Sequence, residues 1–148
     1  MVGRQSLRGE FKDGVLNGHG VLKYADGSRY EGDFSNNKRE GQGAIVFANG
    51  ERYEGKWSLG QRDGQGTFIW PNGDSYDGEF KNNERTGYGV FTSAGGYRYE
   101  GQWWEGRPCG QGTYRTPKGE LFSGAWVDGC YRHGDRRASL GVALASCK

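Results

Sequence analysis

The chain has 148 residues, with 20 Lys or Arg against 18 Asp or Glu, so its formal net charge is +2. Both signs are spread along the sequence and no basic block occurs beyond Arg136-Arg137, which argues against a nucleic-acid binder. The longest apolar stretch, residues 141–145, is far too short to span a membrane.

A period of 23 residues runs through almost the whole chain. We number each repeat from its tyrosine, so that Tyr30 and Tyr53 are position 1 of successive repeats, while Leu7 and Phe122 hold position 1 of the first and sixth. Three columns define the period: position 1 (Tyr30, Tyr53, Tyr76, Tyr99), position 3 (Gly9, Gly32, Gly55, Gly78, Gly101, Gly124) and position 5 (Phe11, Phe34, Trp57, Phe80, Trp103, Trp126). A fixed period of this length indicates stacked units that are not stable alone, and predicts a scaffold rather than an enzyme.

Each repeat contains two stretches that alternate as half-buried strands do, for example residues 53–57 and 64–70 in the third repeat. Turn dipeptides that favour hairpins occur at residues 26–27, 49–50, 72–73 and 95–96. The sequence therefore predicts an all-β protein of six antiparallel hairpins. Joined edge to edge, they would form one elongated single-layer sheet of about twelve strands that spans about 55–60 Å at ~4.8 Å per strand.

Glycine occupies positions 12 and 14 of the first five repeats, in addition to position 3. Because glycine has no side chain, we expect aromatic rings of flanking strands to lie over bare backbone at all three positions. Each ring can bury about 150–250 Å². This ring spine fits a composition that is only 33% hydrophobic but 14% aromatic, which is too poor in aliphatic residues for a two-layer core.

The pattern Tyr-Glu-Gly-x-Trp/Phe, followed by Gly-x-Gly and an Asn-Gly or Asp-Gly turn, resembles the MORN repeat (membrane occupation and recognition nexus) over residues 7 to about 135. The chain is most similar to short all-MORN proteins of protozoan cytoskeletons. The resemblance implies an elongated antiparallel sheet, scaffold and cytoskeletal roles, self-association and a proposed affinity for phospholipids. Some relatives add lipid-kinase or SET-type methyltransferase domains, but no such domain fits in the residues left over here, so we expect no enzyme activity.

The period also predicts the organisation of the chain. We expect a leader, five regular repeats, an atypical terminal repeat and a tail, at residues 1–6, then 7–29, 30–52, 53–75, 76–98 and 99–121, then 122–135, then 136–148. The first repeat starts almost at once and is not an atypical cap. We therefore expect the chain to be the carboxyl-terminal part of a longer array.

The sixth repeat breaks the pattern, because His133 and Asp135 replace the glycines of positions 12 and 14. With Cys130 they form C-x2-H-x-D, a compact spacing for ligands of a structural Zn²⁺, the one candidate cofactor. Cys109, in the equivalent loop ~10 Å away, or a second chain is the candidate fourth ligand. The simpler alternative is that nothing stacks on the last repeat, so that these side chains face water.

An open sheet has two unpaired edges, which favour pairing with another chain. We expect a homodimer at the carboxyl-terminal end, with its interface at Phe122, Trp126, Tyr131 and Trp104. Trp104 lies on the face opposite the ring spine, either as an exposed anchor for a partner or over Arg and Lys stems.

The predicted function is a non-enzymatic scaffold that organises a cytoskeletal structure together with other cytoskeletal proteins. The alternative is a membrane-proximal module that binds phospholipid, such as a phosphoinositide. The even charge distribution argues against strong membrane binding.

Three cysteines at unrelated positions predict no disulfide framework, and no secretory segment opens the chain, so we expect a cytoplasmic, cytoskeleton-associated protein. Residues 136–139, Arg-Arg-Ala-Ser, resemble the site of a basophilic kinase in a tail that we expect to be mobile. We interpret the acidic residues at position 2 as solvated groups paired with neighbouring cations, not as catalytic groups (Glu31, Glu54, Asp77, Glu100).

Overall fold

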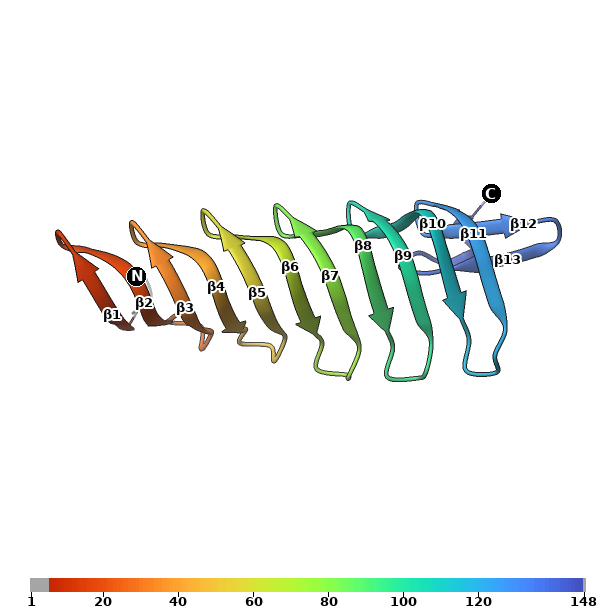
Figure 1. Ribbon diagram of the computed structural model, residues 1–148. Helices are drawn as coiled ribbons and strands as arrows, with labels where there is room; N and C mark the ends of the chain where they lie inside the picture. Colours follow the sequence, from red (N-terminus) through yellow and green to blue (C-terminus); the bar gives the residue numbers. More distant parts are fainter. Residues whose placement is uncertain (1–5, 148) are drawn as a thin grey trace.

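The computed structural model describes residues 6–147, which form one open sheet of 13 antiparallel strands in chain order (Figure 1). The strands are β1 (Ser6–Lys12), β2 (Val15–Lys23), β3 (Arg29–Ser35), β4 (Lys38–Val46), β5 (Arg52–Ser58), β6 (Gln61–Ile69), β7 (Ser75–Lys81), β8 (Glu84–Thr92), β9 (Arg98–Trp104), β10 (Arg107–Arg115), β11 (Leu121–Val127), β12 (Cys130–His133) and β13 (Arg136–Ser139). A short 3₁₀ helix, η1 (Leu144–Ser146), follows. The predicted all-β, elongated single-layer sheet is confirmed.

At both ends of the chain the structure differs from the predicted organisation. Of the leader expected at residues 1–6, residues 1–5 lie outside the described residues, and Ser6 already belongs to β1. The tail expected to be mobile contains β13 and η1, so it is folded. Within residues 6–147, no helix has the length and apolar character needed to cross a bilayer.

The tyrosine column lies over glycine backbone at position 14, as predicted. At position 3 a Cβ would instead meet the backbone of the facing strand, so the prediction of a ring over this glycine is wrong. The Tyr53 ring covers Gly66 so closely that a Cβ on Gly66 would stand 2.6 Å from Cζ of the ring. The Tyr53 hydroxyl donates a hydrogen bond of 2.8 Å to the backbone carbonyl of Lys56. The same hydrogen bond recurs in the other repeats, from Tyr30 to Asp33, from Tyr76 to Glu79 and from Tyr99 to Gln102. Each buried ring thus has its polar end satisfied.

Position 12 was interpreted wrongly. A Cβ on Gly64 would meet the side chain of Lys56 rather than a ring, and the φ of Gly64 is +104°, a conformation that favours glycine. Gly64 lies where the register of β5 and β6 shifts, between the pairs of Gly55 and Trp57. This glycine therefore makes a β-bulge, not a seat for an aromatic ring.

The rings of positions 1 and 5 form a continuous edge-to-face spine along one face of the sheet. The Tyr53 ring centroid lies 5.1 Å from that of Trp57 and 5.0 Å from that of Phe80. Tyr76 repeats the arrangement, at 5.1 Å from Phe80 and 5.2 Å from Trp103. Since each tyrosine contacts the position 5 ring of its own repeat and of the next, the core passes from repeat to repeat and no repeat has a core of its own.

A column of arginines, which was not predicted, connects successive repeats. Arg39, Arg62 and Arg85 hold position 10 of three consecutive repeats, and each donates from Nη2 to a backbone carbonyl of the next repeat, at 2.7, 2.9 and 2.7 Å. The Arg85 guanidinium also lies 4.7 Å from the ring centroid of Trp103. These cations are therefore part of the spine and are not available as a charged binding surface.

The tyrosines make the fold sensitive to alkaline pH. Burial raises the pKa of Tyr53 to about 12, and it also raises the pKa of Tyr30, Tyr76 and Tyr99. The fold favours the neutral phenol, so this stabilisation is complete below the unfolded pKa of about 10 and is lost as pH rises through the folded pKa. We expect the free energy of unfolding, measured by urea titration, to be lower at about pH 11 than at about pH 8. Equal values at the two pH values would contradict this reading of the spine.

Candidate interaction site at the carboxyl-terminal end

The last hairpin of the ribbon is incomplete. β9 pairs with β10 through six residue pairs, but β11 pairs with β12 only through Trp126↔Tyr131 and Val127↔Cys130. The chain then reverses at Gly134 and Asp135 and returns as β13, which pairs with β12. In Figure 1 this β12–β13 hairpin runs crosswise to β11 and projects beyond the end of the ribbon. The second strand of the sixth repeat is therefore split in two, which gives 13 strands rather than about twelve.

The substitutions of the sixth repeat explain this reversal. In the fifth repeat a Cβ on Gly112, at position 14, would lie 2.6 Å from Cε2 of Tyr99. Asp135 holds position 14 of the sixth repeat and has a Cβ, so its backbone cannot approach a position 1 ring as closely. Gly134, with φ of +62°, allows the turn instead. The second strand of the sixth repeat thus separates from β11 where glycine no longer occupies positions 12 and 14.

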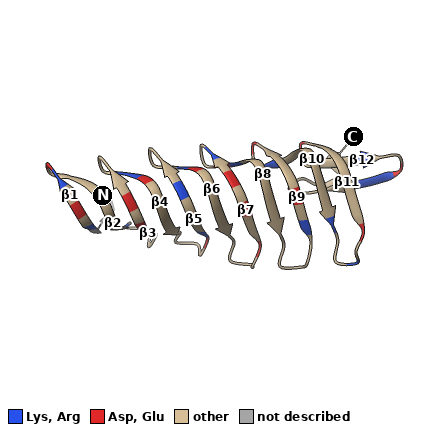
Figure 2. Cartoon of the chain, in the orientation of Figure 1, with Lys and Arg blue, Asp and Glu red and all other residues tan. Residues whose placement is uncertain are grey.

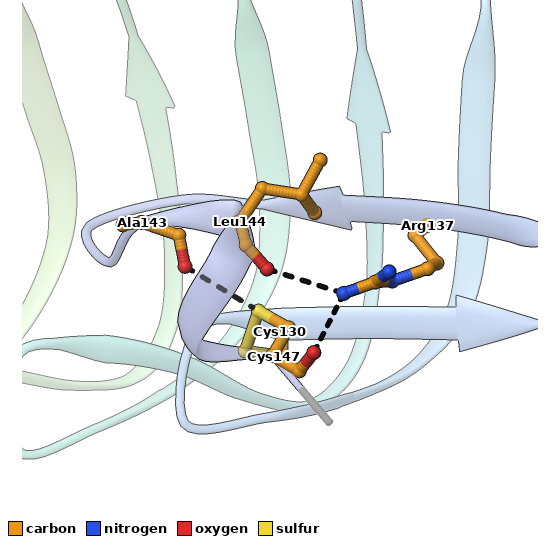
Figure 3. The surroundings of a disulfide bond; sticks show 5 residues. All are labelled: Cys130, Arg137, Ala143, Leu144 and Cys147. Atoms are coloured by element: carbon orange, nitrogen blue, oxygen red, sulfur yellow. Dashed lines mark hydrogen bonds between the residues drawn. A yellow bond between two sulfur atoms is a disulfide. The ribbon is translucent and has the colours of Figure 1, made fainter.

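A disulfide and an arginine hold the tail against the terminal hairpin (Figure 3). Cys147 is bonded to Cys130 of β12, with 5.6 Å between their Cα atoms. Arg137 of β13 donates from Nη2 to the carbonyls of Cys147 at 2.6 Å and Leu144 at 3.3 Å. We call this arrangement of the disulfide, Arg137 and residues 140–147 the tail clamp. Next to it lies a hollow of about 460 Å³ whose lining includes Val127 and Arg132.

The predicted zinc site is not formed. No group of three or more His, Cys, Asp or Glu among residues 6–147 is arranged to hold a metal ion. Cys130, the central candidate ligand, forms a disulfide, and Cys109 is a separate free thiol. His133, at the end of β12, and Asp135, in the hairpin turn, are both exposed. The simpler alternative, that these two side chains face water, is the one that the structure shows.

The cysteines were predicted to provide no disulfide framework, but Cys130 and Cys147, 17 residues apart, are bonded. Stable disulfides are typical of oxidising compartments, and cytosolic ones are usually transient or redox-sensing. A cytoplasmic location therefore stays a prediction without support from the cysteines.

Three of the four residues expected at a dimer interface are buried within the chain. The Tyr131 ring packs against Phe122 and Trp126, at centroid distances of 5.7 and 5.4 Å, and the Arg136 guanidinium covers Phe122 at 4.4 Å. A charge placed at Phe122 or Trp126 would therefore disrupt the terminal hairpin rather than report on association. Trp104 is different, because it is 60% exposed.

Two features remain open to a partner at this end. The outer edge of β11 over residues 121–125 pairs with no strand in the described part of the chain. Trp104 and Val127, at position 6 of successive repeats, are both largely exposed, Val127 by 64%. Trp104 also borders a shallow hollow of about 260 Å³ together with Lys81 and Arg85. An unpaired strand edge and exposed apolar side chains at the same end of a sheet are typical of a protein-binding surface.

The charged residues elsewhere on the ribbon offer no comparable site. Figure 2 shows both signs distributed over the successive strands, with basic residues on the terminal hairpin. Glu31 and Glu100 are exposed and pair with Arg29 and Arg98 at 3.0 and 3.2 Å. For these two residues the predicted solvated ion pairs are present.

A single open sheet of repeated hairpins, in which every repeat completes its core on its neighbours, defines a repeat protein that acts as a scaffold or binding module. The chain belongs to the MORN repeat family, whose model matches residues 8–29, 30–52, 53–75, 76–96 and 99–120. These matches end where the sixth repeat begins. A comparison with curated proteins gives no match.

Proposed function

We propose that this MORN repeat protein is a scaffold that self-associates through its carboxyl-terminal end and thereby organises a cytoskeletal structure in the cytoplasm. The observation that carries the proposal is the unpaired outer edge of β11. A second copy is the partner that fits, because a two-fold axis would pair residues 121–125 with the same residues of the other chain in antiparallel register. The two ribbons would then form one longer rod.

The geometry of β11 indicates which backbone groups would pair. The Ser123 carbonyl accepts a hydrogen bond of 3.3 Å from the Tyr131 hydroxyl, so it points towards the outer edge. In an antiparallel strand the N–H of a residue points to the same side as its carbonyl, so the N–H of Ser123 also faces outwards. The hairpin leaves β11 at Val127 and does not pair with residues 121–125. Trp104 and Val127 would add apolar contacts beside this edge.

The test is the mass of the full chain in light scattering, at several concentrations. We expect a dimer for the unchanged chain and a monomer for Ser123→Pro, which removes an outward N–H without removing one from the β10 ladder. Trp104→Ala should weaken the dimer. Leu59→Ala is the matched control, since Leu59 is 71% exposed but lies far from this end, and it should change nothing.

Two results would count against the proposal. A Ser123→Pro chain that keeps the dimer mass would place the interface elsewhere. A chain that is monomeric at every concentration but sediments with vesicles of anionic phospholipid at physiological salt would favour the lipid-binding alternative instead.

A further inference from the structure

We propose that Ser139 is a phosphorylation site for a basophilic protein kinase, withheld while the tail clamp is closed and exposed when the Cys130–Cys147 disulfide is reduced. The proposal rests on the terminal hairpin and the clamp, and it is independent of self-association. It concerns the Arg136-Arg137-Ala138-Ser139 motif, which the scaffold function does not use.

The motif has the chemistry that such kinases read. Two guanidinium groups precede the serine by three and two residues, where acidic side chains of a kinase can pair with them, provided that the arginines are free and the segment is extended. The segment is extended, since it forms β13. On its far side, β13 pairs with no further strand within the described residues.

In the closed clamp both arginines are exposed, but each makes a contact within the chain. Arg137 donates to the carbonyls of Leu144 and Cys147, and the Arg136 guanidinium lies 4.4 Å from the ring centroid of Phe122. Ser139 is only half-exposed and is paired across the hairpin with Cys130, the residue that carries the disulfide. A kinase therefore cannot engage Arg137 and Ser139 together until the tail moves, whereas Arg136 is exposed and contacts β11 rather than the tail.

Reduction removes the covalent part of the clamp. A dithiol reductant supplies two electrons and two protons, converts the disulfide to the thiols of Cys130 and Cys147, and itself becomes a cyclic disulfide. The tail is then held by the Arg137 hydrogen bonds and by one bond from the Leu140 N–H to the Gly129 carbonyl, at 2.8 Å. Because the disulfide no longer restricts the opened chain, opening becomes more favourable.

The phosphoryl transfer itself is the usual one for a serine. The Ser139 hydroxyl oxygen attacks the γ-phosphorus of Mg-ATP supplied with the kinase, the new O–P bond forms, and the bond from that phosphorus to the bridging oxygen breaks. ADP leaves, and the hydroxyl proton passes to a carboxylate of the kinase.

Phosphorylation would also hold the clamp open. Arg132 and Arg137 are cross-strand partners, and Ser139 lies two residues after Arg137 on the same face of β13. A phosphoserine there offers strong acceptors to both guanidinium groups, in place of the Leu144 and Cys147 carbonyls. The modified chain should therefore re-form the Cys130–Cys147 disulfide less completely in oxidised glutathione than the unmodified chain does.

The experiment uses the purified full chain, Mg-ATP and the catalytic subunit of cyclic-AMP-dependent protein kinase, with phosphate located by mass spectrometry. Oxidised and dithiothreitol-reduced chains are compared, the reductant being removed under inert gas before the assay. We expect Ser139 to be phosphorylated at least about tenfold faster in the reduced chain. This ratio corresponds to a tenfold larger population of chains with an open tail. Ser139→Ala should abolish the incorporation at this site.

Cysteine variants separate the clamp from general effects of reduction. Cys147→Ser and Cys130→Ser should be phosphorylated rapidly without reductant, whereas Cys109→Ser, which removes the free thiol, should behave like the unchanged chain. Circular dichroism must show an intact sheet in each case. Equal rates in the oxidised and reduced chains would overturn the gating, and no phosphate on Ser139 in either the reduced chain or Cys147→Ser would overturn the site.

Discussion

Gly66→Ala should destabilise the ribbon by about 3 kcal/mol, as overpacking of a closed core site does. The added methyl group would stand 2.6 Å from Cζ of Tyr53, and the ring cannot move away because its hydroxyl is bonded to Lys56 and its edges contact Trp57 and Phe80. Since the spine is continuous, we also expect the urea transition to broaden as the repeats on either side of the third unfold separately. Urea titration followed by tryptophan fluorescence and circular dichroism measures both effects.

Gly95→Ala is the matched control for this prediction. Gly95 lies in a hairpin turn without a positive φ, and a Cβ there would meet other atoms only at 3.6 Å or more. Its replacement should change the free energy of unfolding by less than about 0.5 kcal/mol, as surface changes usually do. If Gly66→Ala were tolerated as well as Gly95→Ala, the view that ring-over-glycine packing holds the sheet together would be wrong.

Trp103→Ala and Trp104→Ala should differ greatly, although the two indoles are adjacent in the sequence. Trp103 is 3% exposed, donates from Nε1 to the Gly89 carbonyl at 3.1 Å and lies between the rings of Tyr76 and Tyr99. Its truncation should cost about 4 kcal/mol, because it leaves a cavity in the spine and also removes the ring nearest to the Arg85 guanidinium. Because Trp104 is 60% exposed, Trp104→Ala should lower the free energy of unfolding by no more than about 0.5 kcal/mol.

The same pair also separates folding from association. Trp104→Ala should leave the urea midpoint unchanged while it weakens the dimer, and Trp103→Ala should lower the midpoint at every protein concentration. Similar losses of stability in the two variants would mean that Trp104 is part of the core, which its exposure argues against.

The tail clamp gives the carboxyl-terminal end a second property beside the open edge of β11. In the first five repeats the second strand of each hairpin pairs with the first strand of the next hairpin. At this end the chain instead folds back, and the Cys130–Cys147 disulfide holds the tail. The open edge of β11 precedes the β11–β12 connection in the chain, and the residues of the clamp follow it. Variants of Ser123 and of Cys147 therefore allow association and tail opening to be tested separately.

Much of the fold could be predicted because its determinants are local. Alternation along β5 and β6, and turn dipeptides such as Asn72-Gly73, depend on residues close together in sequence, and the period then repeats one hairpin along the chain. The placement of Tyr53 over Gly66 followed from the same period, since a ring and a missing side chain recur in fixed register. For the same reason, five of the repeats match the family model.

The arginine column could have been predicted from the sequence, but it was not. Arg39, Arg62 and Arg85 recur with the same 23-residue period as the tyrosines. Each guanidinium is satisfied by a carbonyl of the next repeat and lies over an aromatic ring. A periodic cation inside a strand pattern is a usable signal for this kind of packing.

The sequence by itself determined the repeated hairpin, the order of the strands and the spine, because each of these needs only neighbouring residues or the next repeat. Only the tertiary structure decided the end of the ribbon. Whether Cys130 meets a metal, water or Cys147 depends on the path of the chain between them, and that path reverses at Gly134 and again along the tail. The loss of glycine at Asp135 breaks the period, and once the period is broken, sequence position no longer indicates which residues lie together.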